Sequence, residues 1–365
     1  MDVSMANRLD RGFFKYQEEF EKKAVEVLRS GWYVLGKEVS SFEEEFAEYI
    51  GTKYCAGVGN GLDALILAFR ALGIGKGDEV IVQANTYIAS VMGITINGAT
   101  PVFVEPDEYY NLDADKIEEK ITDRTKAVLV VHLYGQASNM GKITEICKKH
   151  QLRLVEDCAQ SHGACFGDRM TGSFSDVGCF SFYPTKNIGA FGDGGAIVTN
   201  DEKINADVRM LRNYGSEKRY YNKVIGVNSR LDEMQAGLLR VRLSHAKELM
   251  EEKQRIGAVY QEKIKNPLLI LPKVLEGAGH VYHQFVIRLK DRDRLIAYLQ
   301  ERKIGSIIHY PIPPHLAEGY QYLGHKEGDY PITEQYAKEV LSIPIFNGME
   351  EAEWEYVIEA LNQFQ

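Results

Sequence analysis

The sequence predicts an α/β fold, with a mostly parallel sheet in a large domain and a smaller α+β domain after it. Three observations carry this prediction. Short apolar runs without polar alternation recur between residues 79 and 200, helical patterns separate them, and the length of 365 residues exceeds one typical domain. Such strands are buried on both faces of a parallel sheet, so we expect a ligand site at their carboxyl ends.

The individual elements follow from local periodicity. Residues 16–30 and 37–51 carry apolar side chains at helical spacing, and Gly31 is a suitable stop for the first of these helices. Helical patterns also cover residues 61–72 and 142–151. The buried strands are predicted at residues 79–85, 100–106, 127–135, 152–159, 178–184 and 195–200.

The C-terminal third has a different texture. A long helical pattern covers residues 230–264 and is typical of a helix that joins two lobes. After it, residues 283–290 are strand-like and residues 293–303 are helix-like. We therefore assign residues 1–249 to the large domain and residues 250–365 to the small one. Whether the N-terminal helix packs on the small domain is left open.

Composition excludes several classes of protein. The net charge is −9, from 43 basic and 52 acidic side chains, and no basic block stands out, so no nucleic-acid partner is expected. No apolar run is long enough for a transmembrane helix, and the charged N-terminus does not resemble a signal peptide, so we expect a cytoplasmic protein with no membrane partner. Five cysteines fit reduced thiols better than a disulfide framework.

The stretch "GVGNGLDALILAF" leads small residues directly into a helix that begins near Gly61 and Leu62. Free N–H groups at a helix start can bind a phosphate, although a glycine-rich helix start is more often plain turn chemistry. The stretch matches neither the P-loop nor the dinucleotide-binding fingerprint.

The stretch "LVEDCAQSHGACFG" ends a buried strand in Glu156 and Asp157. A buried carboxylate must be paired or hydrogen-bonded, and two uses stay open: it holds a proton on a cofactor ring nitrogen, or it caps a helix. A zinc site at Cys158, His162 and Cys165 is disfavoured, because the spacing fits no familiar zinc pattern. We therefore expect no metal.

The stretch "FSFYPTKNIGAFGDGG" sets Lys186 between an aromatic strand and a run of glycines. A lysine in this position either reaches to water and pairs, or has a lowered pKa and forms an imine with a carbonyl group. Ser181 lies earlier in the same stretch. Tyr87, in "VQANTYIAS", either stacks on a flat ring or belongs to the core.

Taken together in this order, the stretches resemble the DegT/DnrJ/EryC1/StrS sugar aminotransferases, which belong to the fold type I superfamily of aspartate aminotransferase. The most specific pieces are "VEDCAQSHGA", "SFYPTKNIGAFGDGGAIVTN" and "NSRLDEMQAG". The resemblance implies a seven-stranded, mostly parallel sheet. It also implies pyridoxal 5′-phosphate as the cofactor, with pyridoxamine 5′-phosphate formed in the half-reaction.

The same resemblance assigns residues around the cofactor ring. Lys186 matches the imine-forming lysine, and Asp157 matches the acid that pairs with the ring nitrogen. Gln160 matches the residue that contacts the ring or its hydroxyl, and Tyr87 falls where an aromatic side chain stacks on the ring. Lys186 and Asp157 are thus the expected catalytic residues.

Four further residues match positions around the cofactor phosphate. Gly61 and Leu62 fall where backbone amides hold it, and Ser181 supplies a hydroxyl. Asn228 matches an asparagine that reaches the phosphate of the neighbouring subunit. This last match implies a homodimer with shared active sites.

The resemblance also points to a substrate. The segment "SIIHYPIPPHLAEGY" resembles that of enzymes that aminate C-3 of dTDP-linked 3-keto-6-deoxyhexoses, with L-glutamate as the amino donor. The alternatives are C-4 amination, a non-transaminating pyridoxal phosphate enzyme such as a dehydratase, and a non-enzymatic regulator. The candidate substrate contacts are Tyr183, Arg219, Tyr221, His309 and Tyr310, although Arg219 also fits a solvated loop charge.

Overall fold

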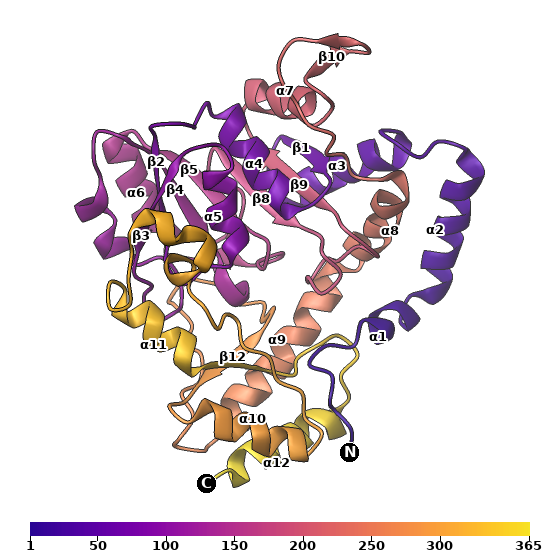
Figure 1. Ribbon diagram of the computed structural model, residues 1–365. Coiled ribbons are helices and arrows are strands. Elements are labelled where there is room, and N and C mark those ends of the chain that lie inside the picture. Colours follow the sequence, from indigo (N-terminus) through magenta and orange to yellow (C-terminus); the bar gives the residue numbers. More distant parts are fainter.

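The computed structural model describes residues 1–365 and contains one central sheet of seven strands (Figure 1). The strand order is β1-β9-β8-β5-β4-β2-β3, and β9 alone runs antiparallel to its neighbours. The predicted mostly parallel, seven-stranded sheet is therefore confirmed. The strands are β1 (Tyr54–Val58), β2 (Glu79–Gln83), β3 (Thr100–Val104), β4 (Thr125–Val131), β5 (Arg153–Asp157), β8 (Val177–Ser181) and β9 (Gly195–Thr199).

Both faces of the sheet are covered, which explains the continuous apolar strands. Val80 and Val82 of β2 pack into the core under α4 (Gly61–Ala71) and α5 (Ile88–Thr95), whereas Ile81 packs on the opposite side against α6 (Met140–His150). Successive strand residues point to opposite faces, so a strand buried on both sides has no polar alternation. Helix α7 (Glu202–Leu211) joins the first of these cores.

A second core forms against the other end of the sheet. Phe42 and Phe46 of α3 (Lys37–Ile50) pack against Phe180 and Phe182, which flank the end of β8. Helices α2 (Gln17–Ser30) and α8 (Glu233–Ser244) complete this core. These aromatic contacts fix the segment that carries Lys186.

The long helix predicted over residues 230–264 is wrong in one respect, because it is two helices. Helix α8 ends at Ser244 and α9 (Ala246–Lys263) begins after His245, whose backbone is not helical (φ −104°, ψ 7°). The His245 ring stacks on Tyr16, with 3.8 Å between ring centroids, and its Nε2 contacts Glu19 at 3.0 Å. Contacts to the N-terminal helices therefore accompany the break, and local periodicity does not register them.

The C-terminal part has its own apolar core around α9. It contains a two-stranded antiparallel sheet of β12 (Phe285–Arg288) and β13 (Val340–Ile343), with α10 (Arg292–Glu301), α11 (Pro331–Glu339) and α12 (Glu351–Gln363). Val3 belongs to this core, and Arg11 of α1 (Leu9–Phe14) forms an ion pair of 2.5 Å with Glu353 of α12. The division at residue 249 falls inside α9 and stays a prediction.

Two short hairpins complete the chain: β6 (Cys165–Phe166) with β7 (Arg169–Met170), and β10 (Ser216–Lys218) with β11 (Tyr221–Asn222). In Figure 1 the β10–β11 hairpin projects beyond α7, at the end of the molecule opposite α10 and α12. All five cysteines are free thiols. None of the helices is long and apolar enough to cross a membrane.

Candidate active site

The predicted site residues converge where β5 and β8 end. Asp157 is the last residue of β5, and Ser181 is the last residue of the neighbouring strand β8. The N-terminus of α4 lies against the same edge, because a Cβ on Gly61 would stand only 2.6 Å from Cβ of Ser181. The topology therefore places a helix start, a carboxylate and the Lys186 segment together.

Asp157 is buried and lacks a charged partner within ion-pair distance. Ser90 of α5 donates its hydroxyl to Oδ2 at 2.8 Å, and the N–H of Ala159 donates to Oδ1 at 3.1 Å. Burial raises the pKa of Asp157, while the Ser90 hydrogen bond, the Ala159 N–H and the nearby Lys186 oppose that rise. The carboxylate thus does not cap a helix and is fixed in orientation. A cation could pair with it.

Lys186 follows β8 in a loop, and its amine has no hydrogen bond or ion pair with another side chain. Burial lowers the pKa of Lys186 to about 8, and the Coulombic attraction of Asp157 works in the opposite direction. An amine with this pKa has a far larger neutral fraction near physiological pH than a lysine with the usual pKa, and a neutral amine is the form that attacks a carbonyl. Of the two readings from sequence, a surface-paired lysine does not fit.

The start of α4 has the features of an anion site. Asn60 caps the helix by accepting the N–H of Asp63 at 2.9 Å, and the preceding N–H groups of Gly61 and Leu62 lie ahead of the first helical hydrogen bonds. Gly195 on β9 leaves no room for a side chain, since a Cβ there would lie 2.4 Å from the carbonyl oxygen of Asn60. The helix start, Ser181 and β9 therefore form one close-packed cradle.

An aromatic wall stands beside this cradle. The rings of Tyr87 and Tyr310 lie 5.0 Å apart, and the Tyr310 hydroxyl accepts a hydrogen bond of 3.0 Å from Nε2 of Gln160. Oε1 of Gln160 in turn accepts the N–H of Tyr134 at 2.6 Å. Half of the Tyr87 side chain is exposed, so this ring can meet a ligand. The structure therefore brings together Tyr87, Gln160 and Tyr310 from distant parts of the sequence.

His309 is fixed next to Tyr310. Its Nδ1 lies 2.8 Å from the Ser342 hydroxyl and its Nε2 lies 3.0 Å from Nε2 of Gln284, while its carbonyl accepts the Tyr134 hydroxyl. Burial, together with the charge of Lys186, lowers the pKa of His309 to about 4. His309 is thus a neutral, hydrogen-bonded ring near neutral pH.

Four predicted residues lie apart from this cluster or at its rim. Tyr183 is half exposed, and its carbonyl accepts the N–H of Lys186 at 2.8 Å. Arg219 and Tyr221 lie on the projecting β10–β11 hairpin and make no contact with the cluster within one chain, and Arg219 stacks over Tyr220. Asn228 is exposed, and only its backbone pairs with Asn213.

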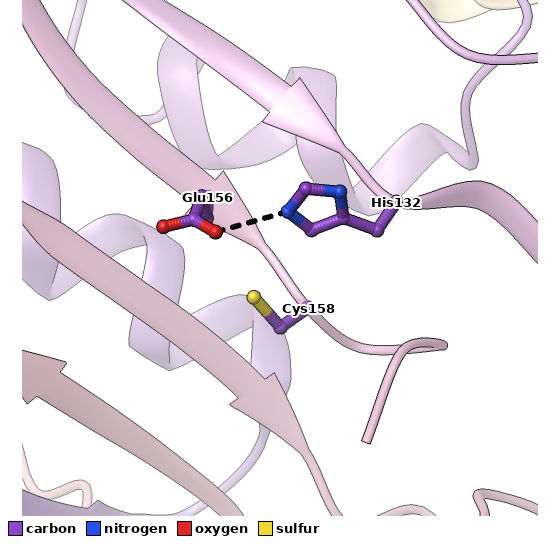
Figure 2. A group of neighbouring side chains, drawn as sticks. All are labelled: His132, Glu156 and Cys158. Carbon is purple, nitrogen blue, oxygen red and sulfur yellow. Dashed lines mark hydrogen bonds and ion pairs between the residues drawn. The ribbon is translucent and has the colours of Figure 1, made fainter. Parts of the chain in front are cut away.

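Figure 2 shows a second buried group of polar side chains, to which we assign no part in the active site. His132 and Glu156 meet across β4 and β5, with 3.1 Å between Nε2 and Oε1, and Cys158 lies beside them. The N–H of Ser138 donates to Nδ1 of His132 at 3.0 Å, so the ring proton is on Nε2 and points to Glu156. Glu156 also accepts the N–H groups of Gly172 and Phe174, at 2.6 and 3.0 Å. We assign this group as a hydrogen-bond network.

The sequence did not reveal two residues, Ser90 and Lys253, that form hydrogen bonds at or next to the predicted site residues. Ser90, which binds Asp157, sits in a short helix that the pattern did not reveal. Lys253 is buried on α9 with Asn187 as a partner, and it stands in the apolar stripe of Leu249, Ile256 and Tyr260. A lysine at a core-facing position was the available signal for this residue.

The residues present fit a pyridoxal phosphate group. Asp157 offers a buried carboxylate without a cation, Lys186 offers an amine without a partner, and the α4 start offers N–H groups beside the Ser181 hydroxyl. These are the donor and acceptor types that a pyridine nitrogen, an aldehyde and a phosphate need.

Comparison with known proteins agrees with this chemistry. The model of the DegT/DnrJ/EryC1/StrS aminotransferase family matches residues 15–362. The fold is that of a fold type I, pyridoxal phosphate-dependent aminotransferase. The chain belongs to the DegT/DnrJ/EryC1/StrS aminotransferase family. The family, fold and enzyme class predicted from sequence are therefore confirmed.

Individual relatives are similar over nearly the whole chain. The dTDP-3-amino-3,6-dideoxy-alpha-D-galactopyranose transaminase of Aneurinibacillus thermoaerophilus is 52% identical over 96% of both chains. The crystal structure of S. venezuelae DesV, in complex with a ketimine intermediate, matches with a TM-score of 0.98 and 43% identity, over 100% of this chain and 98% of that one. A Bacillus subtilis protein, NtdA, with bound cofactor PMP matches with a TM-score of 0.91 and 28% identity, over 97% and 83% of the two chains.

Proposed function

We propose that this protein transfers the amino group of L-glutamate to C-3 of a dTDP-linked 3-keto-6-deoxyhexose, with pyridoxal phosphate as cofactor. The observation that carries the reaction type is the placement of the half-buried Lys186 and the buried Asp157 at the ends of neighbouring strands. The C-3 position is supported by the relative that is 52% identical, a dTDP-3-amino-dideoxyhexose transaminase.

When bound, pyridoxal phosphate supplies an electron-withdrawing ring that makes the proton on the adjacent amine-bearing carbon acidic. Asp157 would keep the ring nitrogen protonated by a charge-assisted hydrogen bond, and Ser90 and Ala159 hold its two oxygens in place for that contact. A cation there would also favour the ionised carboxylate that burial alone disfavours.

Lys186 would accept and then release the proton that moves during amino transfer. Its pKa of about 8 lets it accept a proton at its amine and release it again near neutral pH, which a lysine with the usual pKa would do poorly. Tyr183 lies three residues earlier in the same loop and is half exposed, so it could meet the sugar beside the Lys186 amine.

The remaining residues would bind and orient. The N–H groups of Gly61 and Leu62 and the hydroxyl of Ser181 would hold the phosphate, while Tyr87 would cover one face of the ring and Gln160 its edge. His309 and Tyr310 form the rim next to Tyr87 and would contact the sugar.

A homodimer would complete the site. Arg219 and Tyr221 contact nothing in the cluster of their own chain, and Asn228 leaves its side chain exposed. The hairpin also exposes apolar surface, with 81% of Tyr220 and 91% of Ile225 accessible. We propose that this hairpin and Asn228 reach the active site of a second copy, where the arginine fork would bind the diphosphate.

The test is to incubate the purified protein with L-glutamate and separate 3-keto and 4-keto dTDP-sugars, and to locate the new amine by mass spectrometry. An amine at C-3 supports the proposal, and an amine only at C-4 would identify the other regiochemistry. Uptake of cofactor without any amino sugar would favour a non-transaminating enzyme of the same fold.

A further inference from the structure

A second lysine is buried directly behind the Lys186 loop. Lys253 of α9 is only 2% exposed, and its amine donates to Oδ1 of Asn187 at 3.1 Å and to the carbonyl of His283 at 3.1 Å. No carboxylate lies within ion-pair distance of this amine. A buried ammonium group without a carboxylate is costly, so the site favours the neutral amine.

Lys253 and Lys186 share one environment. Both side chains line a small cavity that also includes Asn187, the residue after Lys186, and the N-terminal segment closes the cavity. The contact between Lys253 and Asn187 therefore ties α9 to the loop that carries the reactive lysine. Neither amine has a carboxylate within ion-pair distance to fix a proton on it.

The titratable and charged groups that face the two amines are Glu252 on α9, Arg242 on α8, Arg8 before α1, Asp157 and His162 around the end of β5, and His280, His283 and His309 in the C-terminal part.

Most of these groups supply no free charge near neutral pH. Burial lowers the pKa of His162 and His280 to about 3, and it lowers that of His283 well below the usual value. Glu252 attracts the Lys253 ammonium, but its carboxylate accepts hydrogen bonds from Asn347 and from the N–H of Gly348 and lies 3.4 Å from the amine of Lys15.

The two arginines are also engaged elsewhere. Arg8 pairs with Asp10 at 2.6 Å, and Arg242 faces the rings of Phe20 and Phe191. Among the groups around the two amines, Asp157 on the Lys186 side is therefore the carboxylate with no other charged partner.

We propose that Lys253 is a positioning residue that forms a coupled pair with Lys186, so that protonation of either amine disfavours protonation of the other. The pair then takes up its two protons in separate steps, and a protonated Lys253 would favour the neutral amine of Lys186. The idea rests on the proposed role of Lys186. It adds a group that touches neither substrate nor cofactor and acts through the amine of Lys186.

The electrostatics agree with the geometry. Burial lowers the pKa of Lys253 to about 7; the attraction of Glu252 opposes this shift, and the charge of Lys186 adds a smaller lowering. Burial lowers the pKa of Lys186 to about 8. When two amines have similar pKa values and repel each other, they bind their protons in two steps, and neither step can be assigned to one amine alone.

The experiment is NMR titration of the full-length protein loaded with pyridoxamine phosphate, in which Lys186 is not bonded to the cofactor, with ¹³C at Cε of every lysine. Lys186→Met and Lys253→Met identify the two signals, and Lys247→Met, at an exposed position of the same helix, is the matched control. In Lys186→Met the Lys253 midpoint should rise by about one pH unit, the size of coupling expected for interacting sites. In Lys247→Met neither midpoint should move.

A second variant keeps the proposal testable if Lys186→Met does not fold. Lys253→Arg places a permanent charge beside the loop, so the midpoint of Lys186 should fall by about one pH unit. Unchanged midpoints in both variants, with folding intact by circular dichroism, would overturn the proposal. That result would leave the proposed function standing, because cofactor uptake and amino transfer are measured separately. Coupled midpoints in a protein that makes no amino sugar would support the coupling of the two lysines and contradict the proposed function.

Discussion

The floor of the site and the β10–β11 hairpin differ in how completely one chain builds them. On the floor, which is formed by Asp157, Gln160, Ser181 and Lys186, every side chain except that of Lys186 has a partner within the chain. Asp157 binds Ser90, Gln160 binds Tyr310, and Ser181 packs on Gly61. On the hairpin, Arg219 and Tyr221 contact only their neighbours and are exposed to solvent. The floor is preorganised by one chain, whereas the role proposed for the hairpin requires a second copy.

The largest effect is expected on the floor. Lys186→Ala removes the amine that we propose as the proton carrier, and we expect a loss of kcat of about 10⁴-fold or more, as for other groups at the centre of catalysis. The measurement is a steady-state assay with the absorbance spectrum of the bound cofactor as a second readout. Lys203→Ala, an exposed lysine, serves as a control and should keep full activity. Near-normal turnover in Lys186→Ala would remove this residue from the mechanism.

The next prediction concerns whether each active site combines the floor of one chain with the hairpin of another. At a sugar nucleotide concentration below the wild-type KM, Lys186→Ala should be inactive and the double variant Arg219→Met, Tyr221→Ala only weakly active, but activity should rise when the two are mixed. Random reassortment makes about half of the dimers mixed, each with one intact site, so about a quarter of all sites become native. Activity is measured after subunit exchange. If mixing restores nothing although exchange is shown by native mass spectrometry, the sites are not shared.

A smaller effect is expected for one hairpin side chain. Arg219→Met removes the proposed fork for the diphosphate, so KM for the sugar nucleotide should rise about tenfold, with kcat and cofactor absorbance nearly unchanged, since each hydrogen bond to a charged group contributes about 1.5–3 kcal/mol. The KM for glutamate is the internal control. An equal change in both KM values would mean that Arg219 does not contact the nucleotide.

The smallest effect concerns stability and pH. Since the pKa of Lys253 is lowered to about 7 in the folded protein, the unfolded chain binds more protons between about pH 7 and the ordinary lysine pKa near 10.5. Burying Lys253 therefore costs most stability below pH 7, and the cost disappears as the pH rises through this window. Lys253→Met should gain a few degrees in Tm relative to the wild type at pH 7, with the difference shrinking toward pH 10. A pH-independent difference would contradict the lowered pKa.

The sequence predicts the floor better than the hairpin for a physical reason. Asp157, Ser181 and Lys186 stand at or just after buried strands, so an apolar run followed by a charged or polar residue marks them. The helix break at His245 depends on the contacts of that ring with Tyr16 and Glu19, which lie far away in sequence. Gly57 interrupts the apolar residues of strand β1, so the sequence shows no continuous apolar run there.

The roles of the hairpin residues could not be derived from the pattern at all. Arg219 and Tyr221 lie in a polar loop, "GSEKRYYNK", that has the composition of a solvated turn, and only the family resemblance singled them out. Lys253 shows the reverse situation. Its position among Leu249, Ile256 and Tyr260 on a buried helix face was visible in the sequence. Its link to the Lys186 loop is seen only in the structure, through the hydrogen bond to Asn187.

The most direct test is to add L-glutamate to the pyridoxal phosphate form of the protein without any sugar and to follow the cofactor spectrum. We expect conversion to the pyridoxamine form with release of 2-oxoglutarate, and return to the original spectrum when the 3-keto dTDP-sugar is added. Lys186→Ala should show neither change. A wild-type spectrum that stays constant with glutamate and with other amino acids would contradict amino transfer.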